Sequence, residues 1–242
     1  MDLEVAFLPT LASGWKDKIC IVVDVLRASS SIVTILENGG DAIYSVHAID
    51  RARRLATEQG LLLCGERNGL PLQGFDCGNS MVELGNMDFQ GKGLVLTTTN
   101  GTAALEQVTQ GNVVLVGCAR NRTACVEVAL KMAVRDNANL GIVCGGSKGR
   151  FALDDAVCAG LLVDTMVHMS ESGLQLADSA MAAQTLYQGS RDLLMAFERS
   201  ESGRRVREIG QADDLQLCAS VDASRMVPQV TCGEPFVIRP FA

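Results

Sequence analysis

Apolar runs of five to eight residues alternate with segments of helical periodicity along most of the chain. Runs of this length are typical of buried strands, whereas apolar positions that recur every three or four residues predict helices. The predicted strands cover residues 18–25, 41–46, 61–65, 93–99, 112–117 and 140–145. The predicted helices cover residues 31–40, 49–59, 102–110, 123–136 and 154–170.

This alternation predicts an α/β fold. Helical crossovers join parallel strands, and hairpin signals are scarce, so we expect a layered α/β/α arrangement with a largely parallel sheet. From residue 178 to about residue 220 the pattern is mainly helical, and a VIRP run near the end predicts a short strand. We expect a single domain over residues 1–242 with a helical C-terminal region; a division into two lobes stays open, since the pattern locates no boundary.

The composition indicates an aliphatic core and an acidic surface. Hydrophobic residues make up 48% of the chain and aromatic residues only 4%, as in α/β proteins with Val-, Ile- and Leu-rich parallel strands. The net charge of −7 argues against a nucleic-acid partner, which would require a basic face. A small anionic substrate stays open, because a local pocket can be positive on an acidic protein.

The beginning of the chain, MDLEVAFLPT, lacks the basic region of a signal peptide. No apolar run approaches membrane-spanning length, so we expect a cytoplasmic protein with no membrane contact. None of the nine cysteines is in the C-x-x-C spacing of zinc or redox sites, which favours reduced and mostly buried thiols. Homo-oligomerisation stays open.

Three strand–loop–helix units share one plan, with small polar residues in the loop. Their loops follow the strands at 18–25, 93–99 and 140–145. In open α/β sheets, ligands bind outside the carboxyl ends of the strands, and N–H groups at the next helix favour an anion. We therefore expect these loops to form one anion-binding site.

The first loop contains Asp24, Arg27 and three serines at 29–31. A strand-end aspartate can ligate a hard cation such as Mg²⁺ or attack phosphorus. Arg27 offers a planar fork for phosphate or sulfonate oxygens, and Ser29 and Ser30 add hydroxyls. Alternatively, these residues only cap a helix and form a local ion pair.

Two further segments carry candidate groups. The polar stretch 64–80 contains Glu66 and Asp76 as carboxylates for a metal, and Asn79; alternatively it is a solvated loop tied by Arg67. The run TTTNGT contains Thr99, Asn100 and Gly101 at a strand end. Because a helix follows, it is better interpreted as a phosphate-binding loop than as a hairpin turn.

The segment CGGSKGRFALDDA at 144–156 allows three interpretations. Cys144 and Arg150 have the C-x₅-R spacing of cysteine-dependent phosphatases. Alternatively, Lys148 supplies charge while Asp154 and Asp155 bind a metal. The third interpretation, which we favour for the cysteine, makes Cys144 a buried strand residue and Asp154 a helix cap.

Several other site types lack support. The two histidines, His47 and His168, have no neighbouring pattern of a catalytic triad or a metal centre, and no G-x-G-x-x-G motif is present.

Taken in order, the motifs DVLRASSSI, GERNG with GFDCGNS, TTTNGTAAL and FALDDAVCAG resemble those of the 2-phosphosulfolactate phosphatase family. GQADDLQLCASVD and MVP resemble its C-terminal pattern, so the likeness covers nearly the whole chain. The resemblance implies Mg²⁺-dependent hydrolysis of (R)-2-phospho-3-sulfolactate to sulfolactate and phosphate, a step toward coenzyme M. It implies site residues at Asp24, Arg27, Glu66, Asp76, Asn79, Asn100, Gly101 and Asp155.

The sequence therefore predicts a Mg²⁺-dependent phosphatase for this substrate or a related small phosphorylated acid. Asp24, Arg27, Glu66 and Asp155 are the expected catalytic residues. Ligands to Mg²⁺ are expected from Asp24, Glu66, Asp76 and Asp155. Two alternatives are a cysteine phosphatase that uses Cys144 and Arg150, and a non-catalytic protein that binds small anions.

Overall fold

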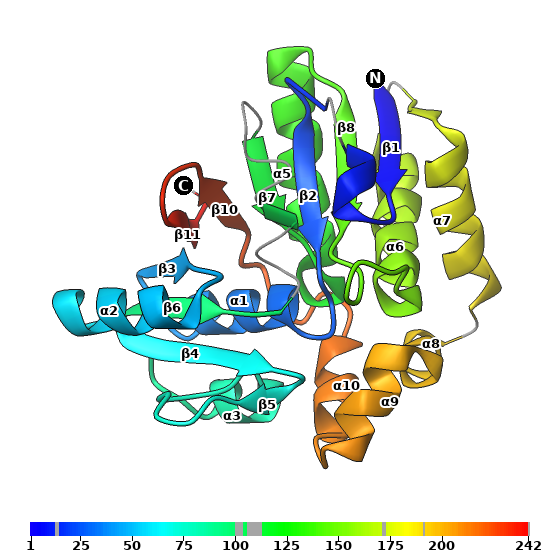
Figure 1. Cartoon of the computed structure of the whole chain (residues 1–242). Helices are drawn as coiled ribbons and strands as arrows, with labels where there is room; N and C mark the ends of the chain where they lie inside the picture. The colour runs from blue at the N-terminus through cyan, green and yellow to red at the C-terminus, as the bar shows by residue number, and fades with distance from the viewer. Residues whose placement is uncertain (13–14, 100–103, 106–112, 171–172, 191, 242) are drawn as a thin grey trace.

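The computed structural model describes residues 1–12, 15–99, 104–105, 113–170, 173–190 and 192–241. Within these residues the strands form one 11-stranded sheet with the order β5-β4-β6-β3-β11-β10-β7-β2-β8-β1-β9. The sheet is strongly twisted, so that β3, β6 and β4 run nearly crosswise to β2 and β8 in Figure 1. The prediction of a layered α/β fold with a largely parallel sheet is confirmed.

Six of the strands correspond to the runs predicted from sequence. They are β2 (Ile19–Val23), β3 (Ala42–Ser45), β4 (Leu62–Arg67), β6 (Gly93–Thr97), β7 (Val113–Val116) and β8 (Leu140–Cys144). The pairs β2–β7, β2–β8, β3–β6 and β4–β6 are all parallel. Continuous apolar composition therefore identified the strands that are buried on both faces.

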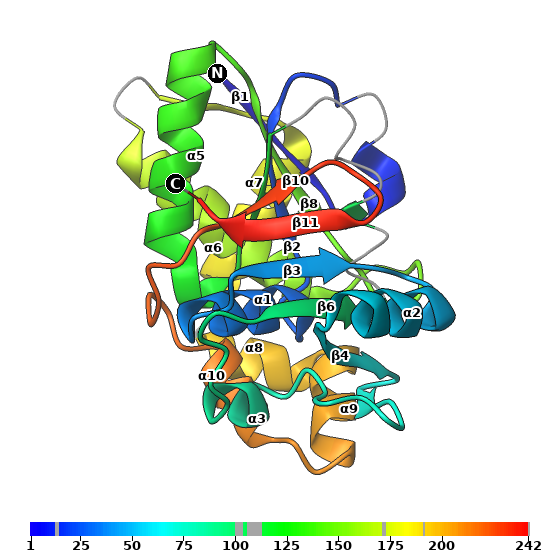
Figure 2. The same ribbon diagram turned by 90° about the vertical axis from the view of Figure 1, so that its left-hand side faces the viewer.

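The remaining strands lie at the sheet edges or in hairpins. β1 (Asp2–Ala6) and β9 (Gln175–Leu176) extend the parallel half beyond β8. β5 (Leu70–Pro71) folds back on β4, and β10 (Pro228–Thr231) pairs antiparallel with β11 (Phe236–Pro240). This second hairpin is inserted between β7 and β3 (Figure 2). The sequence predicted only its second strand.

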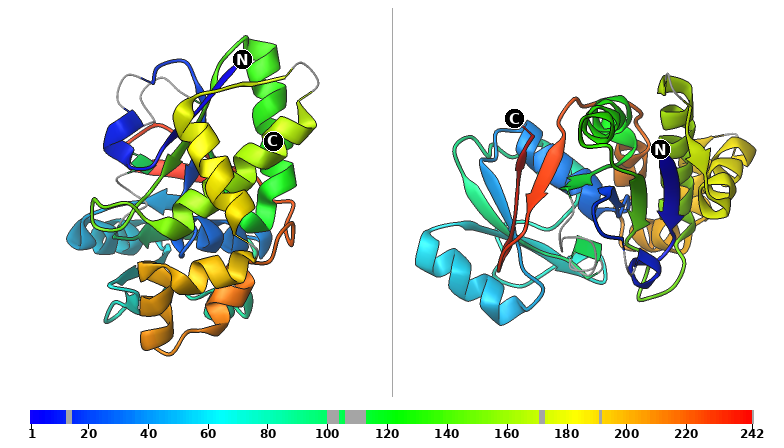
Figure 3. Two further views of the ribbon diagram at one scale, coloured as in Figure 1. Left: turned by 90° about the vertical axis from the view of Figure 1, so that its right-hand side faces the viewer. Right: turned by 90° about the horizontal axis from the view of Figure 1, so that it is seen from above.

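Helices cover both faces of the sheet. Three long helices, α5 (Arg122–Asp136), α6 (Leu153–Met169) and α7 (Asp178–Gly189), pack side by side over the half that contains β1, β2 and β8 (Figure 3). The other half is covered by α1 (Ala28–Glu37) with α3 (Met81–Gly85), and by α2 (Ile49–Gln59) against β4 and β6. Of the helix predicted at 102–110, only Ala104 and Leu105 lie within the described residues, and both are helical.

Alternation along the central strand β2 builds the core on two sides. Ile19, Ile21 and Val23 pack into the cluster beneath α5 and α6, whereas Cys20 and Val22 join the cluster with α1, β3 and β6. All five residues are buried. Because successive side chains of a strand point to opposite faces, this single strand anchors both layers and fixes the position of the residue that follows it.

Three short C-terminal helices lie across the carboxyl ends of β2 and β8 (Figure 1). They are α8 (Leu193–Arg199), α9 (Glu201–Glu208) and α10 (Asp213–Cys218). α8 packs on α6, and α10 packs on α3. The helical C-terminal region predicted from sequence therefore covers the edge of the sheet at which a ligand is expected. No helix in the described part of the chain is long and apolar enough to cross a membrane.

Candidate active site

A polar cavity of about 200 Å³ opens between the carboxyl ends of the parallel strands and α9. Its walls come from the residues after β2, from the end of β4, from Thr98 and Thr99 after β6, and from the loop after β8. The charged residues of the lining are Asp24, Arg27, Glu66, Lys148, Glu201, Arg204, Arg205 and Glu208. Three loops that sequence alone predicted to share one site thus meet at one cavity.

Asp24 lies on the floor of this cavity, directly after β2, and is 7% exposed. Burial raises the pKa of its carboxyl group from 3.8 to about 7, and the nearby carboxylates of Glu66 and Asp154 add to the shift. The Ala28 backbone N–H and the Arg27 charge oppose the shift only in part. A carboxyl group balanced between its charge states near neutral pH is a mark of a functional site.

Two of the predicted metal ligands are instead engaged by backbone N–H groups. The Asp155 oxygens accept hydrogen bonds from the Val25 N–H and the Gly146 N–H, both at 2.9 Å. This carboxylate therefore joins the loops after β2 and β8 and fixes their relative position. Burial raises the pKa of Asp155 well above its ordinary value, with further contributions from Asp154 and Asp24.

Glu66 has the same role on the other side of the cavity. One of its oxygens accepts hydrogen bonds from the backbone N–H and the hydroxyl of Thr99, both at 2.9 Å. The other oxygen accepts from the Gly69 N–H at 2.6 Å. Glu66 lines the cavity, but its hydrogen bonds show that it mainly holds the loop after β6 against the hairpin of β4 and β5.

Arg27 is 3% exposed and lines the cavity, but its main partner is not local. Its guanidinium donates to Asp214, to the Gln211 side chain at 2.5 Å and to the Gly69 carbonyl at 2.8 Å. Three of its five N–H donors are thus used by the protein. The alternative of a local pair with Asp24 is not what the structure shows.

Sequence reasoning missed Asp214, which is fully buried on α10. Besides Arg27, it accepts hydrogen bonds from the Ser80 hydroxyl at 2.9 Å and the Val82 N–H at 3.0 Å. It therefore ties the C-terminal helices to the starts of α1 and α3. The signal that could have found it is the segment GQADDLQLC, which the family resemblance already included.

The predicted substrate-binding residues differ in where they lie. Thr99 and Asn79 line the cavity. Ser29 and Ser30 do not, because the Ser29 hydroxyl accepts from the Asp24 N–H and the Ser30 hydroxyl donates to the Val25 carbonyl. Their hydroxyls stabilise the turn into α1. Asn100 and Gly101 lie outside the described residues.

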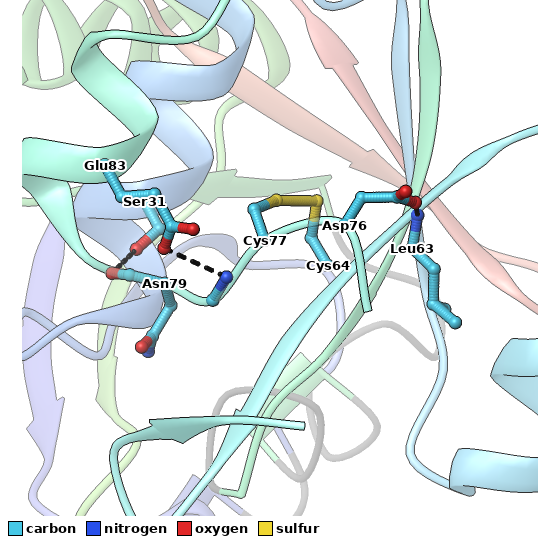
Figure 4. Close-up of a disulfide and its surroundings, with 8 residues drawn as sticks. Ser31, Leu63, Cys64, Asp76, Cys77, Asn79 and Glu83 are labelled. Atoms are coloured by element: carbon cyan, nitrogen blue, oxygen red, sulfur yellow. Dashed lines mark hydrogen bonds between the residues drawn. A yellow bond between two sulfur atoms is a disulfide. The ribbon is translucent and has the colours of Figure 1, made fainter. Parts of the chain in front are cut away.

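Asp76 is not brought to the cavity. It is exposed, and its carboxylate accepts from the Leu63 N–H at 2.7 Å near the beginning of β4 (Figure 4). The segment after β5 runs back beside β4, so Asp76 closes a loop and does not join the lining residues.

The same return of the chain corrects the prediction that all cysteines are reduced. Cys64 and Cys77 form a disulfide between Cα atoms 4.8 Å apart (Figure 4). The Gly65 N–H donates to the Cys77 carbonyl at 3.0 Å, which brings the two residues together across a sequence separation of 13. No familiar cysteine motif has this spacing. Six further cysteines are free and buried, at positions 20, 118, 125, 144, 158 and 218.

The geometry does not support the cysteine-phosphatase alternative. Cys144 ends β8 and is 1% exposed. Burial raises the pKa of its thiol well above 9, and the neighbouring Asp155 and Asp154 raise it further, so the reactive thiolate is disfavoured. Arg150 is exposed and pairs with Glu201 at 2.9 Å. Cys144 is therefore a buried strand residue.

Two buried oxygen atoms besides those of Asp24 are of the type that Mg²⁺ binds. The Asn79 Oδ1 and Asp154 Oδ1 atoms are buried and accept no hydrogen bond from the described residues. Asp154 lies in the first turn of α6, whose N-cap is Ala152. No cluster of three or more His, Cys, Asp or Glu side chains with metal-binding geometry occurs in the described part of the chain. Mg²⁺ commonly uses only one or two carboxylates, completed by water and substrate phosphate.

A polar cavity at the ends of several strands of an α/β sheet, lined by a buried carboxyl group and an arginine, defines a site for a small anionic molecule. A sequence model of the family described as 2-phosphosulpholactate phosphatase matches residues 8–233. The chain belongs to this family.

Individual relatives agree over nearly their whole length. A protein of Pseudothermotoga lettingae is 35% identical over 93% of this chain and 94% of its own. Proteins of Clostridium acetobutylicum and Deinococcus radiodurans are each 34% identical, over 90% and 97% of this chain and over 92% and 95% of their own lengths. All three are named probable 2-phosphosulfolactate phosphatase. The prediction of a phosphoric monoester hydrolase is thereby confirmed.

Proposed function

We propose that this chain hydrolyses the phosphate ester of 2-phosphosulfolactate with the help of Mg²⁺. The observation that supports this most directly is the buried Asp24 carboxyl on the floor of the cavity, beside Arg27 and two loops at strand ends. This arrangement suits a phosphoryl group, whose transfer depends mainly on positioning and on neutralising charge.

The phosphoryl group is proposed to lie against Arg27, beside Asp24. Arg27 retains two N–H donors beyond the three that bind Asp214, Gln211 and Gly69. These three contacts fix the orientation of its guanidinium, so the side chain loses little conformational freedom when an anion binds. Glu66 accepts hydrogen bonds from the hydroxyl and the N–H of Thr99 and so fixes Thr99 at the same cavity.

Asp24 and the Asn79 Oδ1 atom are the proposed protein ligands of Mg²⁺, and Asp154 adds a second negative charge close by. A bound Mg²⁺ supplies positive charge for the phosphate oxygens and for the developing negative charge. Glu66 and Asp155 act instead as positioning residues, because their oxygens already accept backbone N–H groups. This assignment differs from the ligand set predicted from sequence.

The test is a phosphate-release assay with 2-phosphosulfolactate, 2-phospholactate, 2-phosphoglycerate and a simple aryl phosphate. We expect turnover of the first substrate, loss of turnover in EDTA and recovery with added Mg²⁺. Full activity in EDTA would contradict the metal requirement while leaving the phosphatase assignment intact. No release from any of the four esters with Mg²⁺ present would contradict the proposed function.

A further inference from the structure

The charged residues that line the cavity form two sets, one buried and one exposed or half-buried. The floor carries Asp24 and Glu66, and the charge of Arg27 is balanced from behind by the buried Asp214. The opposite wall is formed by α9 and the loop after β8, and it contributes Lys148, Arg204 and Arg205. The floor is therefore the acidic end of the cavity, and the α9 wall is the basic end.

The α9 wall also contains acidic residues, but they offset its positive charge only in part. Glu201 pairs with Arg150 at 2.9 Å, and both side chains are well exposed. Among the described lining residues of α9, Glu208 is the other acid, and it faces two arginines, Arg204 and Arg205. The acidic floor suits a cation with a phosphate, whereas the basic wall suits an anionic group on a different part of the same substrate.

Arg205 is the α9 residue best placed for such a group. It is half-buried and lines the cavity, and its side chain forms no hydrogen bond or ion pair with the part of the chain that the structure describes. Arg204 also lines the cavity, but it is exposed and donates to the Arg199 carbonyl at 2.5 Å. Arg207, two residues further, is exposed, does not line the cavity and lies 3.9 Å from Glu198.

We propose that Arg205 binds the anionic group of the substrate that is remote from the phosphate, and thereby selects a sulfonated over a non-sulfonated phosphate ester. This inference rests on the proposed function, because it places the phosphate at Asp24 and Arg27. A guanidinium presents paired N–H donors to oxygens of a tetrahedral anion, and the half-buried position strengthens that interaction relative to bulk water.

The orientation follows from size as well as charge. A cavity of about 200 Å³ has room for a three-carbon acid with its phosphate. The phosphate is carried by the central carbon, between the carboxylate and the sulfomethyl group. With the phosphate on the floor, the sulfonate reaches one atom further than the carboxylate, so it is the anionic group that we place against α9. A substrate that lacks the sulfonate would leave the Arg205 charge partly desolvated and unpaired, which is costly.

The experiment compares 2-phosphosulfolactate with 2-phospholactate, in which a methyl group replaces the sulfomethyl group. We expect R205Q to raise KM for the sulfonated ester and to lower the ratio of the two kcat/KM values by roughly 10- to 100-fold, the scale of one charged hydrogen bond. R205K should recover part of the ratio because it keeps the charge. R207Q is the matched control on the same helix and should leave the ratio unchanged.

A parallel titration of sulfolactate by calorimetry reads the proposed subsite independently of hydrolysis. We expect R205Q to weaken sulfolactate binding by a similar factor, while R207Q binds like the parent. Two results would overturn the role of Arg205. One is an equal loss of kcat/KM for both esters in R205Q, and the other is binding of sulfolactate to R205Q with the affinity of the parent. If the parent binds sulfolactate through Arg205 but hydrolyses neither ester, the subsite stands and the proposed function fails.

Discussion

The D24N substitution separates the catalytic role of Asp24 from its effect on stability. In the folded protein without metal, burial and the carboxylates of Glu66 and Asp154 raise the pKa of Asp24 from 3.8 to about 7. The shift of about three units corresponds to about 4 kcal/mol of differential interaction. The D24N substitution removes the unfavourable free energy of a charged carboxylate at this buried position, with little change in the shape of the side chain.

The sign of the pH dependence follows from proton binding. Between pH 3.8 and about 7 the folded state keeps the Asp24 proton and the unfolded state loses it. The stability that this group contributes is therefore fully present below pH 3.8 and is lost as the pH rises to about 7. We expect the advantage of D24N over the parent to grow by about 3 kcal/mol between pH 5 and pH 8.

The measurement is urea unfolding of both proteins in EDTA at the two pH values. In a thermal scan at pH 8, the Tm of the D24N protein should lie roughly 10 °C above that of the parent, given the usual relation between free energy and Tm at this chain length. Its kcat with Mg²⁺ should fall by about 10² or more, the scale of a lost electrostatic group. Equal stability differences at pH 5 and pH 8 would refute the reasoning, and parent-like kcat would remove Asp24 from the site.

Three further substitutions test other contacts. D214N should lower the free energy of unfolding by about 3–5 kcal/mol, because it leaves Arg27 buried and uncompensated; denaturant titration that shows less than 1 kcal/mol would contradict this network. C144S should keep kcat within a few-fold of the parent, since the buried thiol is not a nucleophile; loss of turnover with unchanged circular dichroism would revive the cysteine mechanism. C77S should cost about 3 kcal/mol through the loop that the disulfide closes, and the difference from the parent should vanish when both are unfolded in dithiothreitol.

Central strands were predictable from sequence because burial on both faces leaves a continuous apolar run, as in β2 and β8. The partly exposed strands gave no such run. β1 alternates acidic and apolar residues, and β9 has only two residues. β10 begins with Pro228, which is uncommon within a sheet. Hydrogen bonding to a distant strand, and not local pattern, determines that these segments are extended.

The site was predictable to the extent that it depends on strand ends. Asp24 directly follows β2 and Thr99 lies two residues after β6, and both line the cavity. The antiparallel hairpin of β10 and β11 lies between the two parallel groups, so the twist of the sheet, which the sequence does not reveal, brings these two strand ends together. The partners of each side chain were not predictable. Nothing local distinguishes Asp155, whose oxygens bind two N–H groups, from Asp24, which faces the cavity. The pairing of Arg27 with Asp214 joins residues 187 positions apart.

The position of the β10–β11 hairpin has a consequence for the order in which the protein can assemble. Among the described strands, this hairpin is the sole hydrogen-bonded link between the β5-β4-β6-β3 group and the β7-β2-β8-β1-β9 group. Its residues are synthesised after those of every other strand. Until they arrive, β3 and β7 each present an unpaired edge, which is the kind of surface that favours intermolecular pairing. The sheet of this chain is therefore expected to close only after residues 228–240 have left the ribosome.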